Sequence, residues 1–546
     1  MRLLIIGAVA AGTSAAAKAR RNNEENQIVI YEKGEYISYA GCGMAYYIAG
    51  DVASGNSIHP RNVKYFKDTY NVDIKLGHEV VKIIPENQTI IVKDLASGIE
   101  FVDRYDKLII ATGARALIPP VPGVNKEHVF PLRNVNDMYK ITSFLEEKKP
   151  VNAVVVGGGF IGLEMTESLV KLGLNVSIVE MKDQIATNLD VDMAKLVELE
   201  LLKENVNVYK GLAAAEIHDH SVTLNNGETI LGDIVIMSAG VRPNSEIAVE
   251  AGIKTGKFRG ILVNDKLETN LPNIYAAGDV SEQYHLLLKD YAYLPMGSTA
   301  NKQGRVAGDQ ATGGNLIFKG VFGTSVYRVF NQTVAQTGLN EASALAAGYE
   351  PVTIFNIKPN KVTYLGGKDM TIKAVADKKS GKILGAQIVG PEGVDRRIDV
   401  LATAIYFGAT ASDLVDLDLA YSPPYSTVRD PVNYTGMIIS NILNKDTPQV
   451  SSKEVLEKIK KGEPLTIIDT RPAILYGADH IEGAISIPLT DLRKKAPTLP
   501  TDRPIYLYCS RGLDGYVGQK ILLNLGFSNV YNVRGGYLGY LIENDF

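Results

Sequence analysis

The stretches RLLIIGAVAAG at residues 2–12 and AVVVGGGFIG at residues 153–162 decide the fold. Each is a short apolar run that ends in glycine and small residues, and each is followed by a segment with the apolar spacing of a helix. A second apolar run then ends in an acid, IVIYE at Glu32 and SIVE at Glu180. We therefore predict two copies of a strand, a glycine turn, a helix and a second strand, about 150 residues apart.

This arrangement is typical of dinucleotide-binding units. Glycines let the backbone approach a pyrophosphate, the start of the helix offers unpaired N–H groups, and an acid about 20 residues later accepts ribose hydroxyls. Glu32 follows Gly12 by 20 residues, and Glu180 follows Gly162 by 18. The first copy departs from the usual pattern because Val9 stands where a middle glycine is expected. A glycine-rich turn with an exposed acid is the alternative, and the duplication argues against it.

The composition is that of an ordinary globular chain. Its 546 residues correspond to three or four domains of roughly 150 residues each. Lys and Arg number 57 against 61 Asp and Glu, and the net charge of −4 argues against nucleic-acid binding. No run reaches the roughly 18 apolar residues that a membrane span needs. The N-terminus imitates a signal peptide, but the same residues make a better strand, glycine turn and helix.

The chain has two cysteines, Cys42 and Cys509, which lie 467 positions apart. That spacing excludes a disulfide framework and the usual zinc-ligand pairs. The seven histidines do not cluster, so we expect no metal centre. A reducing compartment, the cytoplasm, is the expected location.

The order of the segments predicts a discontinuous first domain. LIIATGARALIPPVPG at 108–123 and LPNIYAAGDV at 271–280 each contain a strand that would complete the first unit, and the second unit lies between them. The polar stretch NKDTPQVSS at 444–452 reads as a linker. We predict an α/β chain with a first nucleotide-binding domain at 1–115 and 240–325, a second at 116–239, a mixed α+β region at 326–447 and a small α/β domain at 453–546.

With these motifs, residues 1–445 resemble the two-dinucleotide flavoprotein disulfide reductases. The resemblance implies two Rossmann-like domains, FAD on the first and a nicotinamide nucleotide on the second, and a third domain that forms a homodimer. SYAGCG at 38–43 resembles the single-cysteine branch, which has Ser-x-x-x-Cys and includes coenzyme A disulfide reductases, NADH oxidases and NADH peroxidases. The implied cofactor-binding residues are Gly7, Ala10, Gly12, Glu32, Lys33, Thr112, Gly113, Gly278 and Asp279 for FAD, and Gly157, Gly159, Gly162, Glu180 and Gly240 for the nicotinamide nucleotide.

Cys42 has no second cysteine nearby, so an internal disulfide cannot carry the electrons. A lone thiol of this kind cycles through a sulfenic acid or through a mixed disulfide with an outside molecule. In the oxidase and peroxidase relatives, a histidine in the first glycine turn serves the peroxide chemistry. Here residues 8–10 are Ala-Val-Ala, and no histidine precedes His59, which favours the mixed disulfide. A buried, inert thiol is the alternative for Cys42.

The coenzyme A branch places basic residues on the first helix and a Tyr-x-Pro-Pro-Tyr segment near the end of the third domain. This chain has basic residues at 18–21 and the sequence YSPPY at 421–425. A solvated charged face is the alternative for the basic run, and core packing is the alternative for the tyrosines. The resemblance implies a coenzyme A site made of Ser14, Lys18, Arg21, Ser38, Asn301 and Arg429. It also implies catalytic roles for Tyr364, Tyr421 and Tyr425, with Tyr364 or Tyr421, from the partner subunit, as the proton donor.

The last domain resembles a rhodanese domain throughout, in IIDTRP (467–472), ADHIEGAISIP (478–488), LYCSRGLDG (507–515) and NVRGGY (532–537). In that family a cysteine, here Cys509, opens a loop whose N–H groups face the sulfur. Asp514 stands where such loops have arginine or another residue that tolerates an anion. A carboxylate there disfavours a thiolate and anionic donors such as thiosulfate, and Arg511 partly offsets it. An inactive, structural rhodanese domain is the alternative.

Together the motifs predict an FAD-dependent, NADH-consuming reductase of coenzyme A persulfide or disulfide. Cys42 would form a mixed disulfide with coenzyme A, and Cys509 would handle sulfane sulfur. The Glu180 carboxylate accepts ribose hydroxyls and repels a 2′-phosphate, so NADH is expected over NADPH, although Lys182 lies close enough to soften the preference. Two alternatives stay open: an NADH oxidase or peroxidase that uses a Cys42 sulfenic acid, and a sulfur-trafficking protein centred on Cys509. We expect neither a nucleic acid nor a membrane as partner.

Overall fold

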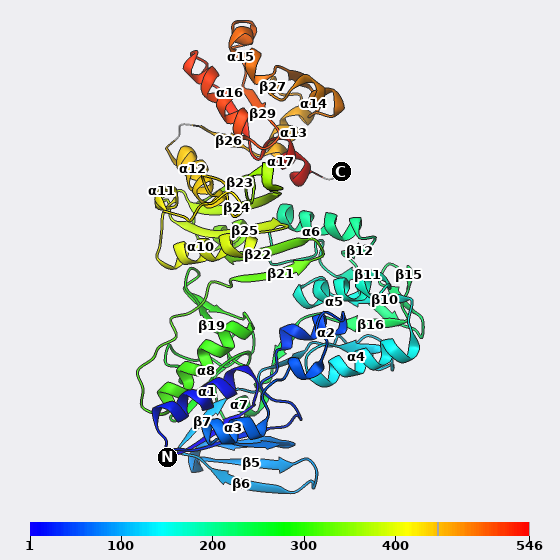
Figure 1. Ribbon diagram of the computed structural model, residues 1–546, viewed down its shortest axis with the longest axis vertical. Helices are drawn as coiled ribbons and strands as arrows, with labels where there is room; N and C mark the ends of the chain where they lie inside the picture. The colour runs from blue at the N-terminus through cyan, green and yellow to red at the C-terminus, as the bar shows by residue number, and fades with distance from the viewer. Residues whose placement is uncertain (445–446, 545–546) are drawn as a thin grey trace. The chain divides into compact units, whose positions relative to one another are not determined.

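The computed structural model describes residues 1–444 and 447–544, which form two compact units. The first unit contains residues 1–185 and 204–321, and the second contains residues 186–203 and the chain from Phe322 onward. Figure 1 shows both units as mixtures of helices and strands. Among the described residues, no helix is both long enough and apolar enough to cross a lipid bilayer.

The first unit begins with a parallel sheet of strand order β18-β7-β1-β2-β3. Four of the five residues of β1 are buried, as expected for a central parallel strand whose two faces are both covered. Its strands are β1 (Arg2–Ile6), β2 (Gln27–Glu32), β3 (Asp73–Leu76), β7 (Lys107–Ile110) and β18 (Ile274–Ala276). The first unit also contains α1 (Ala10–Asn22), α2 (Met44–Ile48), α3 (Val63–Tyr70), α7 (Glu246–Glu250), α8 (Gly297–Ala311), the antiparallel sheet β4 (His78–Ile84), β5 (Thr89–Asp94), β6 (Glu100–Arg104), and the hairpin β19 (Gln283–His285), β20 (Asp290–Ala292).

Helices α1 and α8 pack against each other at backbone distance (Figure 1). A methyl group added at Gly304 would lie 2.2 Å from the carbonyl oxygen of Ala11, and one at Gly308 would lie 2.2 Å from that of Ala15. The two glycines and the two alanines are each four residues apart, so one helical turn of each helix meets one turn of the other. The alanine-rich sequence of α1 is therefore explained by this close approach.

A second parallel sheet of the first unit has the order β12-β11-β10-β16-β9. In it, β10 and β11 pair in parallel as β1 and β2 do, so the predicted repeat of strand, glycine turn, helix and strand is confirmed. The strands are β9 (Val129–Pro131), β10 (Asn152–Val156), β11 (Asn175–Glu180), β12 (Asn207–Lys210) and β16 (Ile234–Met237), with α4 (Val135–Lys148) and α5 (Phe160–Lys171). Smaller sheets are formed by β13 (Ala214–Ile217), β14 (Ser221–Leu224), β15 (Thr229–Leu231), and by β8 (Ala114–Ala116) with β17 (Val241–Pro243).

The second unit contains an antiparallel sheet of order β21-β22-β25-β24-β23. All eight residues of β25 are buried. The strands are β21 (Ser325–Val329), β22 (Gln332–Gly338), β23 (Pro351–Pro359), β24 (Asp369–Asp377) and β25 (Ile383–Gly390). The accompanying helices are α6 (Val191–Lys203), α9 (Glu341–Ala346), α10 (Val394–Tyr406), α11 (Ala411–Asp416) and α12 (Pro431–Leu443).

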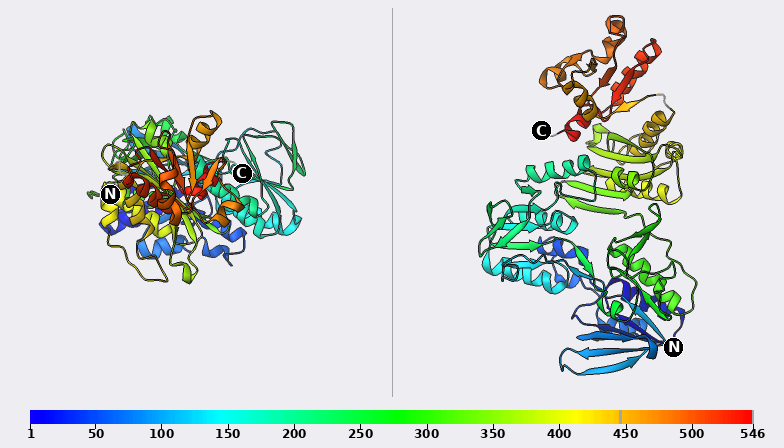
Figure 2. Two further views of the ribbon diagram at one scale, coloured as in Figure 1. Left: turned by 90° about the horizontal axis from the view of Figure 1, so that it is seen from above. Right: turned by 180° about the vertical axis from the view of Figure 1, so that it is seen from behind.

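The C-terminal part of the second unit is a small α/β domain, drawn in orange and red in Figure 2. Its parallel sheet has the order β26-β30-β29-β27-β28, formed by β26 (Gln449–Val450), β27 (Thr466–Asp469), β28 (Ala484–Ser486), β29 (Ile505–Tyr508) and β30 (Val530–Val533). The helices are α13 (Ser452–Lys460), α14 (Ala473–Ala478), α15 (Leu489–Lys495), α16 (Leu513–Asn524) and α17 (Gly536–Glu543). The predicted linker overlaps residues 445–446, which lie outside the described residues, and the domain boundaries read from the sequence stay a prediction.

One residue of the basic run on α1 is structural rather than solvated. Arg20 is 3% exposed, and its guanidinium donates to the carbonyl oxygens of Tyr70 and Asn26, each at 2.8 Å, and of Asn71 at 2.9 Å. Its neighbour Arg21 is exposed. Buried carbonyl groups need such donors because they have lost their contact with water.

We expect Arg20→Met to destabilise the first unit by about 3 kcal/mol, because several carbonyl oxygens, that of the buried Asn26 among them, lose a charged donor at once. Arg21→Met is the matched control, one residue away and exposed, and it should change stability by less than about 0.5 kcal/mol. Scanning calorimetry of the two variants beside the parent chain measures this. Equal unfolding temperatures in both variants would show that the Arg20 hydrogen bonds add nothing to stability.

Candidate functional site

The first glycine turn joins β1 to α1 at very short range. Gly7 has a φ of +101°, and a methyl group added at Gly12 would lie 1.8 Å from the Gly7 carbonyl oxygen. The Glu32 carboxylate lies over this turn, where it accepts hydrogen bonds from the N–H of Ala8 at 2.8 Å and of Gly34 at 2.7 Å. The acid is thereby fixed beside the free N–H groups at the start of α1.

The second glycine turn repeats these contacts. Gly157 has a φ of +111°, and a methyl group at Gly162 would lie 1.9 Å from the Gly157 carbonyl oxygen. Glu180 accepts from the N–H of Gly158 at 2.8 Å and of Lys182 at 2.9 Å. At Gly159, by contrast, an added methyl group would meet no atom within 4 Å. The backbone at Gly159 therefore faces open space, which fits the approach of a pyrophosphate.

The segment Gly278–Asp279 follows β18, the neighbour of β7 in the first sheet. Asp279 pairs with Arg133 at 2.7 Å, and the N–H of Gly278 donates to the side-chain oxygen of Gln303 at 2.8 Å. Burial raises the pKa of Tyr39 to about 12, although Arg133 opposes the shift. Tyr39 is thus a neutral phenol at any physiological pH. Sequence reasoning missed both Arg133 and Gln303, since nothing in their local sequence indicates these distant partners.

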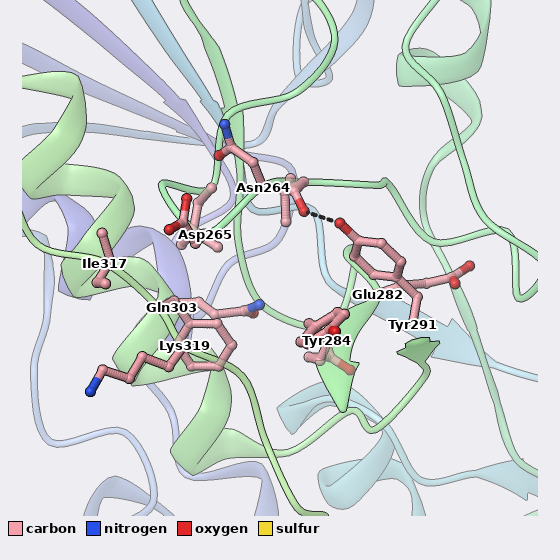
Figure 3. A pocket seen from close by; sticks show the side chains of 12 residues that line it. Asn264, Asp265, Glu282, Tyr284, Tyr291, Gln303, Ile317 and Lys319 are labelled. Carbon is pink, nitrogen blue, oxygen red and sulfur yellow. Dashed lines mark hydrogen bonds between the residues drawn. The ribbon is translucent and has the colours of Figure 1, made fainter. Parts of the chain in front are cut away.

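Gln303 also lines a cavity of 380 Å³ in the first unit, together with Asp265, Tyr284 and Tyr291 (Figure 3). The Tyr291 hydroxyl donates to the carbonyl oxygen of Val263 at 2.7 Å, the dashed line in Figure 3. None of the residues predicted from the sequence as site residues lines this cavity. It therefore lies outside the predicted cofactor and substrate sites.

The remaining cofactor candidates lie at strand and helix ends. Gly113 and Gly240 both have positive φ, +64° and +109°. The Thr112 hydroxyl donates to the carbonyl oxygen of Asn244 at 2.7 Å. Ala10 is the first residue of α1, and Lys33 is exposed, 3.8 Å from Glu79. Within the described residues, no group of three or more His, Cys, Asp or Glu side chains is arranged to bind a metal.

The segment that carries Cys42 is tied to the first glycine turn. Ser38, in a left-handed conformation with a φ of +48°, donates its N–H to the carbonyl oxygen of Ala8 at 2.9 Å. Cys42 follows in a short 3₁₀ turn, Gly41–Gly43, and is exposed. The Ala40 N–H, directly before the turn, donates to the Ile58 carbonyl oxygen at 2.8 Å. A non-glycine residue with this φ is strained, and such strain is a frequent mark of a functional segment.

The coenzyme A candidates of the first unit lie along α1 and α8. The Ser14 hydroxyl donates to the side-chain oxygen of Asn301 at 2.7 Å, and Lys18 pairs with Asp309 at 3.0 Å. One turn further along α1, Arg21 is exposed. The structure therefore brings Ser14, Asn301 and Lys18 together on one seam.

The candidates of the second unit are exposed. Tyr364 is 75% exposed and Tyr425 is 71% exposed, and Tyr421 and Arg429 are also exposed. Core packing, the alternative reading for these tyrosines, does not hold within one chain. Of the four candidates, Tyr421, Tyr425 and Arg429 lie in the segment between α11 and α12, and Tyr364 lies in a 3₁₀ turn between β23 and β24.

Cys509 directly follows β29 and is 4% exposed. Its sulfur accepts the N–H of Gly512 at 3.1 Å, and its carbonyl oxygen accepts the N–H of Tyr537 at 2.7 Å. A methyl group at Gly536 would lie 2.2 Å from that carbonyl oxygen. Asp514 is in the first turn of α16. Arg511 extends away to Asp369, with which it pairs at 2.6 Å, so its charge is already matched.

Comparison with known sequence families identifies the class of the protein. Residues 1–304 match the family "Pyridine nucleotide-disulphide oxidoreductase", residues 325–431 match its dimerisation domain, and residues 451–543 match the "Rhodanese-like domain". The first match covers more than half of the chain, and the chain belongs to the pyridine nucleotide-disulphide oxidoreductase family. The family uses FAD and NAD(P)H. The predicted family, fold class and enzyme class are confirmed.

The individual relatives named below align with between 79% and 99% of the chain. The NADH oxidase of Methanocaldococcus jannaschii is 36% identical over 79% of this chain and 97% of its own length. The coenzyme A disulfide reductase of Staphylococcus haemolyticus is 32% identical over 80% of this chain and 98% of its own length. Two solved structures align with 99% of the chain. Reduced Bacillus anthracis CoADR-RHD has a TM-score of 0.96, 37% identity and 98% of its chain covered, and the NAD-dependent persulfide reductase from A. fulgidus has a TM-score of 0.93, 34% identity and 100% covered.

We expect Gly159→Ala to fold normally and to bind NADH about 10-fold more weakly. The added methyl group meets no protein atom within 4 Å but enters the space through which a pyrophosphate approaches the backbone. Thermal denaturation checks the fold, and an NADH titration of the reduced enzyme measures the affinity. Gly162→Ala is the contrasting variant, since its methyl group would strike the Gly157 carbonyl oxygen and lower stability. Unchanged NADH affinity in Gly159→Ala would place the nucleotide elsewhere.

Proposed function

We propose that this chain is an FAD-dependent, NADH-consuming reductase of coenzyme A persulfide or coenzyme A disulfide. The hydrogen bond from Ser38 to Ala8 carries the proposal, because it ties the segment of an exposed lone thiol to the first glycine turn. The two proteins named CoADR-RHD and NAD-dependent persulfide reductase, which align with almost the whole chain, support it. The coenzyme A disulfide reductase of Staphylococcus haemolyticus supports it further.

The chain's own residues suit both cofactors. The glycine turns supply backbone N–H groups for the pyrophosphates, and Glu32 and Glu180 are fixed to accept ribose hydroxyls. FAD, when bound, accepts a hydride from NADH and supplies an electron pair to sulfur. We assign FAD to Gly7, Ala10, Gly12, Glu32, Lys33, Thr112, Gly113, Gly278 and Asp279, and NADH to Gly157, Gly159, Gly162, Glu180 and Gly240, with domain boundaries at 1–115 plus 240–325 and at 116–239.

Cys42 performs the sulfur chemistry in this proposal. Its thiolate attacks the sulfur bonded to coenzyme A in CoA–S–SH, the Cys42–S–S–CoA bond forms, and the S–SH bond breaks to release HS⁻. An electron pair that originates from NADH and one proton then return the Cys42 thiolate and free coenzyme A. The hydroxyl of Tyr364 or Tyr421 donates the proton to the leaving sulfur, and Tyr425 lies in the same segment as Tyr421. Their exposure fits a donor that completes the site of a partner subunit.

The matched dimerisation domain supports a homodimer formed by residues 326–447. Coenzyme A carries several phosphate charges, and the basic side chains assigned to it offset them. Lys18 already pairs with Asp309, so the exposed Arg21 is the stronger candidate on α1. We assign coenzyme A to Ser14, Lys18, Arg21, Ser38, Asn301 and Arg429. Two free thiols, one of them exposed, fit a reducing compartment such as the cytoplasm.

Cys509 in the rhodanese-like domain, 453–546, takes sulfane sulfur in this proposal. Its thiolate attacks the outer sulfur of a persulfide R–S–SH, so that Cys509–S–SH forms and R–S⁻ leaves with no net change of oxidation state. The Gly512 N–H at 3.1 Å stabilises the developing anion. Burial of the sulfur shelters the persulfide from water and oxidants.

We expect kcat/KM for NADH to exceed that for NADPH by about 10-fold or more. Both oxygens of the Glu180 carboxylate are held by backbone N–H groups, so the negative charge cannot move away from a 2′-phosphate. The ratio measured with a coenzyme A substrate at saturation checks this. Glu180→Gln should narrow the ratio, and a preference of the parent enzyme for NADPH would refute the argument.

We expect Cys42→Ser to lower the rate of reduction of coenzyme A persulfide and disulfide by at least about 10³-fold, because the chain's other thiol, Cys509, is buried in the rhodanese-like domain and does not replace it. Its flavin content and its reduction by NADH should be unchanged. Cys509→Ser is the matched control: it should keep reduction of preformed coenzyme A persulfide and lose only reactions that need a separate sulfane donor.

The parent enzyme and the two cysteine variants also distinguish between the three candidate functions. Rapid turnover with hydrogen peroxide, and none with coenzyme A persulfide, would indicate an oxidase or peroxidase like the relative from Methanocaldococcus jannaschii. Sulfur delivery to another protein that survives Cys42→Ser, together with no coenzyme A reduction by the parent chain, would indicate sulfur trafficking. Steady-state kinetics with purified substrates separates the three outcomes.

A further inference from the structure

The rhodanese-like domain packs against the antiparallel sheet of the same unit. The Arg534 guanidinium donates to the Thr353 hydroxyl at 2.5 Å and lies 5.2 Å from the ring centre of Phe355. A methyl group added at Gly535 would lie 3.2 Å from the Cβ atom of Phe355. Since Thr353 and Phe355 belong to β23, the domain that carries Cys509 rests on this strand.

An ion pair joins the loop after Cys509 to the same sheet. The Arg511 guanidinium lies 2.6 Å from the Asp369 carboxylate. Asp369 is the first residue of β24 and lies opposite Pro359, the last residue of β23. The side chains of Arg511 and Asp369 are 43% and 33% exposed, so solvent and small solutes reach both. The pair therefore links the rhodanese-like loop to the dimerisation domain without being buried between them.

The backbone of Arg511 is part of the tight turn around the sulfur. Arg511 directly precedes Gly512, whose N–H donates to the Cys509 sulfur at 3.1 Å. A methyl group added at Gly536 would lie 2.2 Å from the Cys509 carbonyl oxygen and 3.0 Å from the backbone nitrogen of Arg511. The side chain of Arg511 thus begins beside the sulfur, and the direction it takes decides whether its charge faces a donor there.

The loop itself contains no second basic residue. Residues 510–515 are Ser-Arg-Gly-Leu-Asp-Gly, and the carboxylate among them, Asp514, is exposed. At the end of the neighbouring strand β27, the Arg471 guanidinium is buried and pairs with Asp469 at 2.7 Å. A donor with two negative charges therefore meets a carboxylate in the loop, while the loop's guanidinium is bound to Asp369.

We propose that Asp369 of the dimerisation domain determines which sulfane donors the Cys509 loop accepts. By holding Arg511, it keeps the loop's cation from the donor, which disfavours doubly charged donors such as thiosulfate and favours persulfides. The inference rests on the proposed role of Cys509 as a sulfur carrier. Asp369 acts through Arg511, so it is a positioning residue that sets specificity.

The chemistry of the two donors explains the difference. With thiosulfate, the Cys509 thiolate attacks the outer sulfur, the Cys509–S–S⁻ bond forms, the S–S bond of the donor breaks and SO₃²⁻ leaves with no net change of oxidation state. A free guanidinium binds the charged oxygens of donor and leaving group with paired hydrogen bonds. The attacked end of a protonated persulfide, R–S–SH, carries no charge, so a free guanidinium adds little.

The test uses the full-length chain with Cys42→Ser, in which Cys509 is the remaining thiol. The donors are thiosulfate and glutathione persulfide, and the initial rate of persulfide formation on Cys509 is measured by rapid alkylation and mass spectrometry. We expect Asp369→Asn to raise the rate with thiosulfate about 5-fold and to keep the rate with glutathione persulfide within about 2-fold. A gain of activity of this kind cannot come from a variant that fails to fold.

Two further variants identify the cause of the gain. Glu350→Gln is the matched control: Glu350 pairs with Lys379 at 2.6 Å and precedes β23, at the opposite end of the β23–β24 pairing from Asp369. It removes the same charge from the same sheet and should change neither rate. The double variant Asp369→Asn/Arg511→Gln should lose the gain with thiosulfate, because the released guanidinium produces it.

The outcomes separate this inference from the proposed function. An unchanged thiosulfate rate in Asp369→Asn, an equal rise in Glu350→Gln, or a rise that persists in the double variant would each overturn the inference. No transfer from either donor in the Cys42→Ser chain would refute the carrier role of Cys509, and the inference with it. Neither assay uses NADH, so failure of the proposed reductase function would show separately, as absence of turnover with coenzyme A substrates.

Discussion

The backbone contact between β1 and α1 is the constraint on which the flavin side of the molecule depends. With a methyl group at Gly12 only 1.8 Å from the Gly7 carbonyl oxygen, no other residue lets the helix start so close to the strand. Ala8 lies in this turn and makes two backbone hydrogen bonds: its N–H donates to the Glu32 carboxylate, and its carbonyl oxygen accepts from the Ser38 N–H. One short turn thus fixes both Glu32, the proposed nucleotide-binding acid, and the segment that carries Cys42.

The second turn shows which part of this arrangement is general. Gly162 repeats the contact with Gly157, and Glu180 repeats the hydrogen bond to the turn, but no cysteine follows within the second copy. In the proposed function, the glycine contact and the held carboxylate therefore serve nucleotide binding, and the Ser38 hydrogen bond is the feature that the first copy adds for sulfur chemistry. The spacing of glycines and acids revealed the common part in the sequence, because strand, turn and helix are local and follow short-range rules.

The sequence could not reveal contacts between side chains far apart in the chain. Arg20 and Arg21 are adjacent and chemically identical, yet only the first is buried, because the carbonyl groups it meets belong partly to residues 70 and 71. Helix α6 lies between β11 and β12 in the chain but belongs to the second unit. Asp190 and Asp192, before and within its first turn, pair with the buried ammonium of Lys373 at 3.1 and 2.7 Å. Buried ion pairs of this kind form only when tertiary packing removes both charges from water, and the local sequence pattern does not indicate this.

The two thiols differ in exposure, but backbone hydrogen bonds hold the segments of both, and this bears on whether the thiol or its substrate moves. Cys509 is buried, its sulfur bonded to one backbone N–H and its carbonyl oxygen to another, so its loop cannot swing without breaking both hydrogen bonds. Cys42 is exposed, but the hydrogen bonds of Ser38 and Ala40 anchor the segment that leads into its turn. Since neither sulfur lies on a free segment, we expect each thiol to be reached by its substrate rather than to swing toward it. A thiol on a long, flexible arm, as in coenzyme A, meets that requirement both at an exposed sulfur and at a buried one.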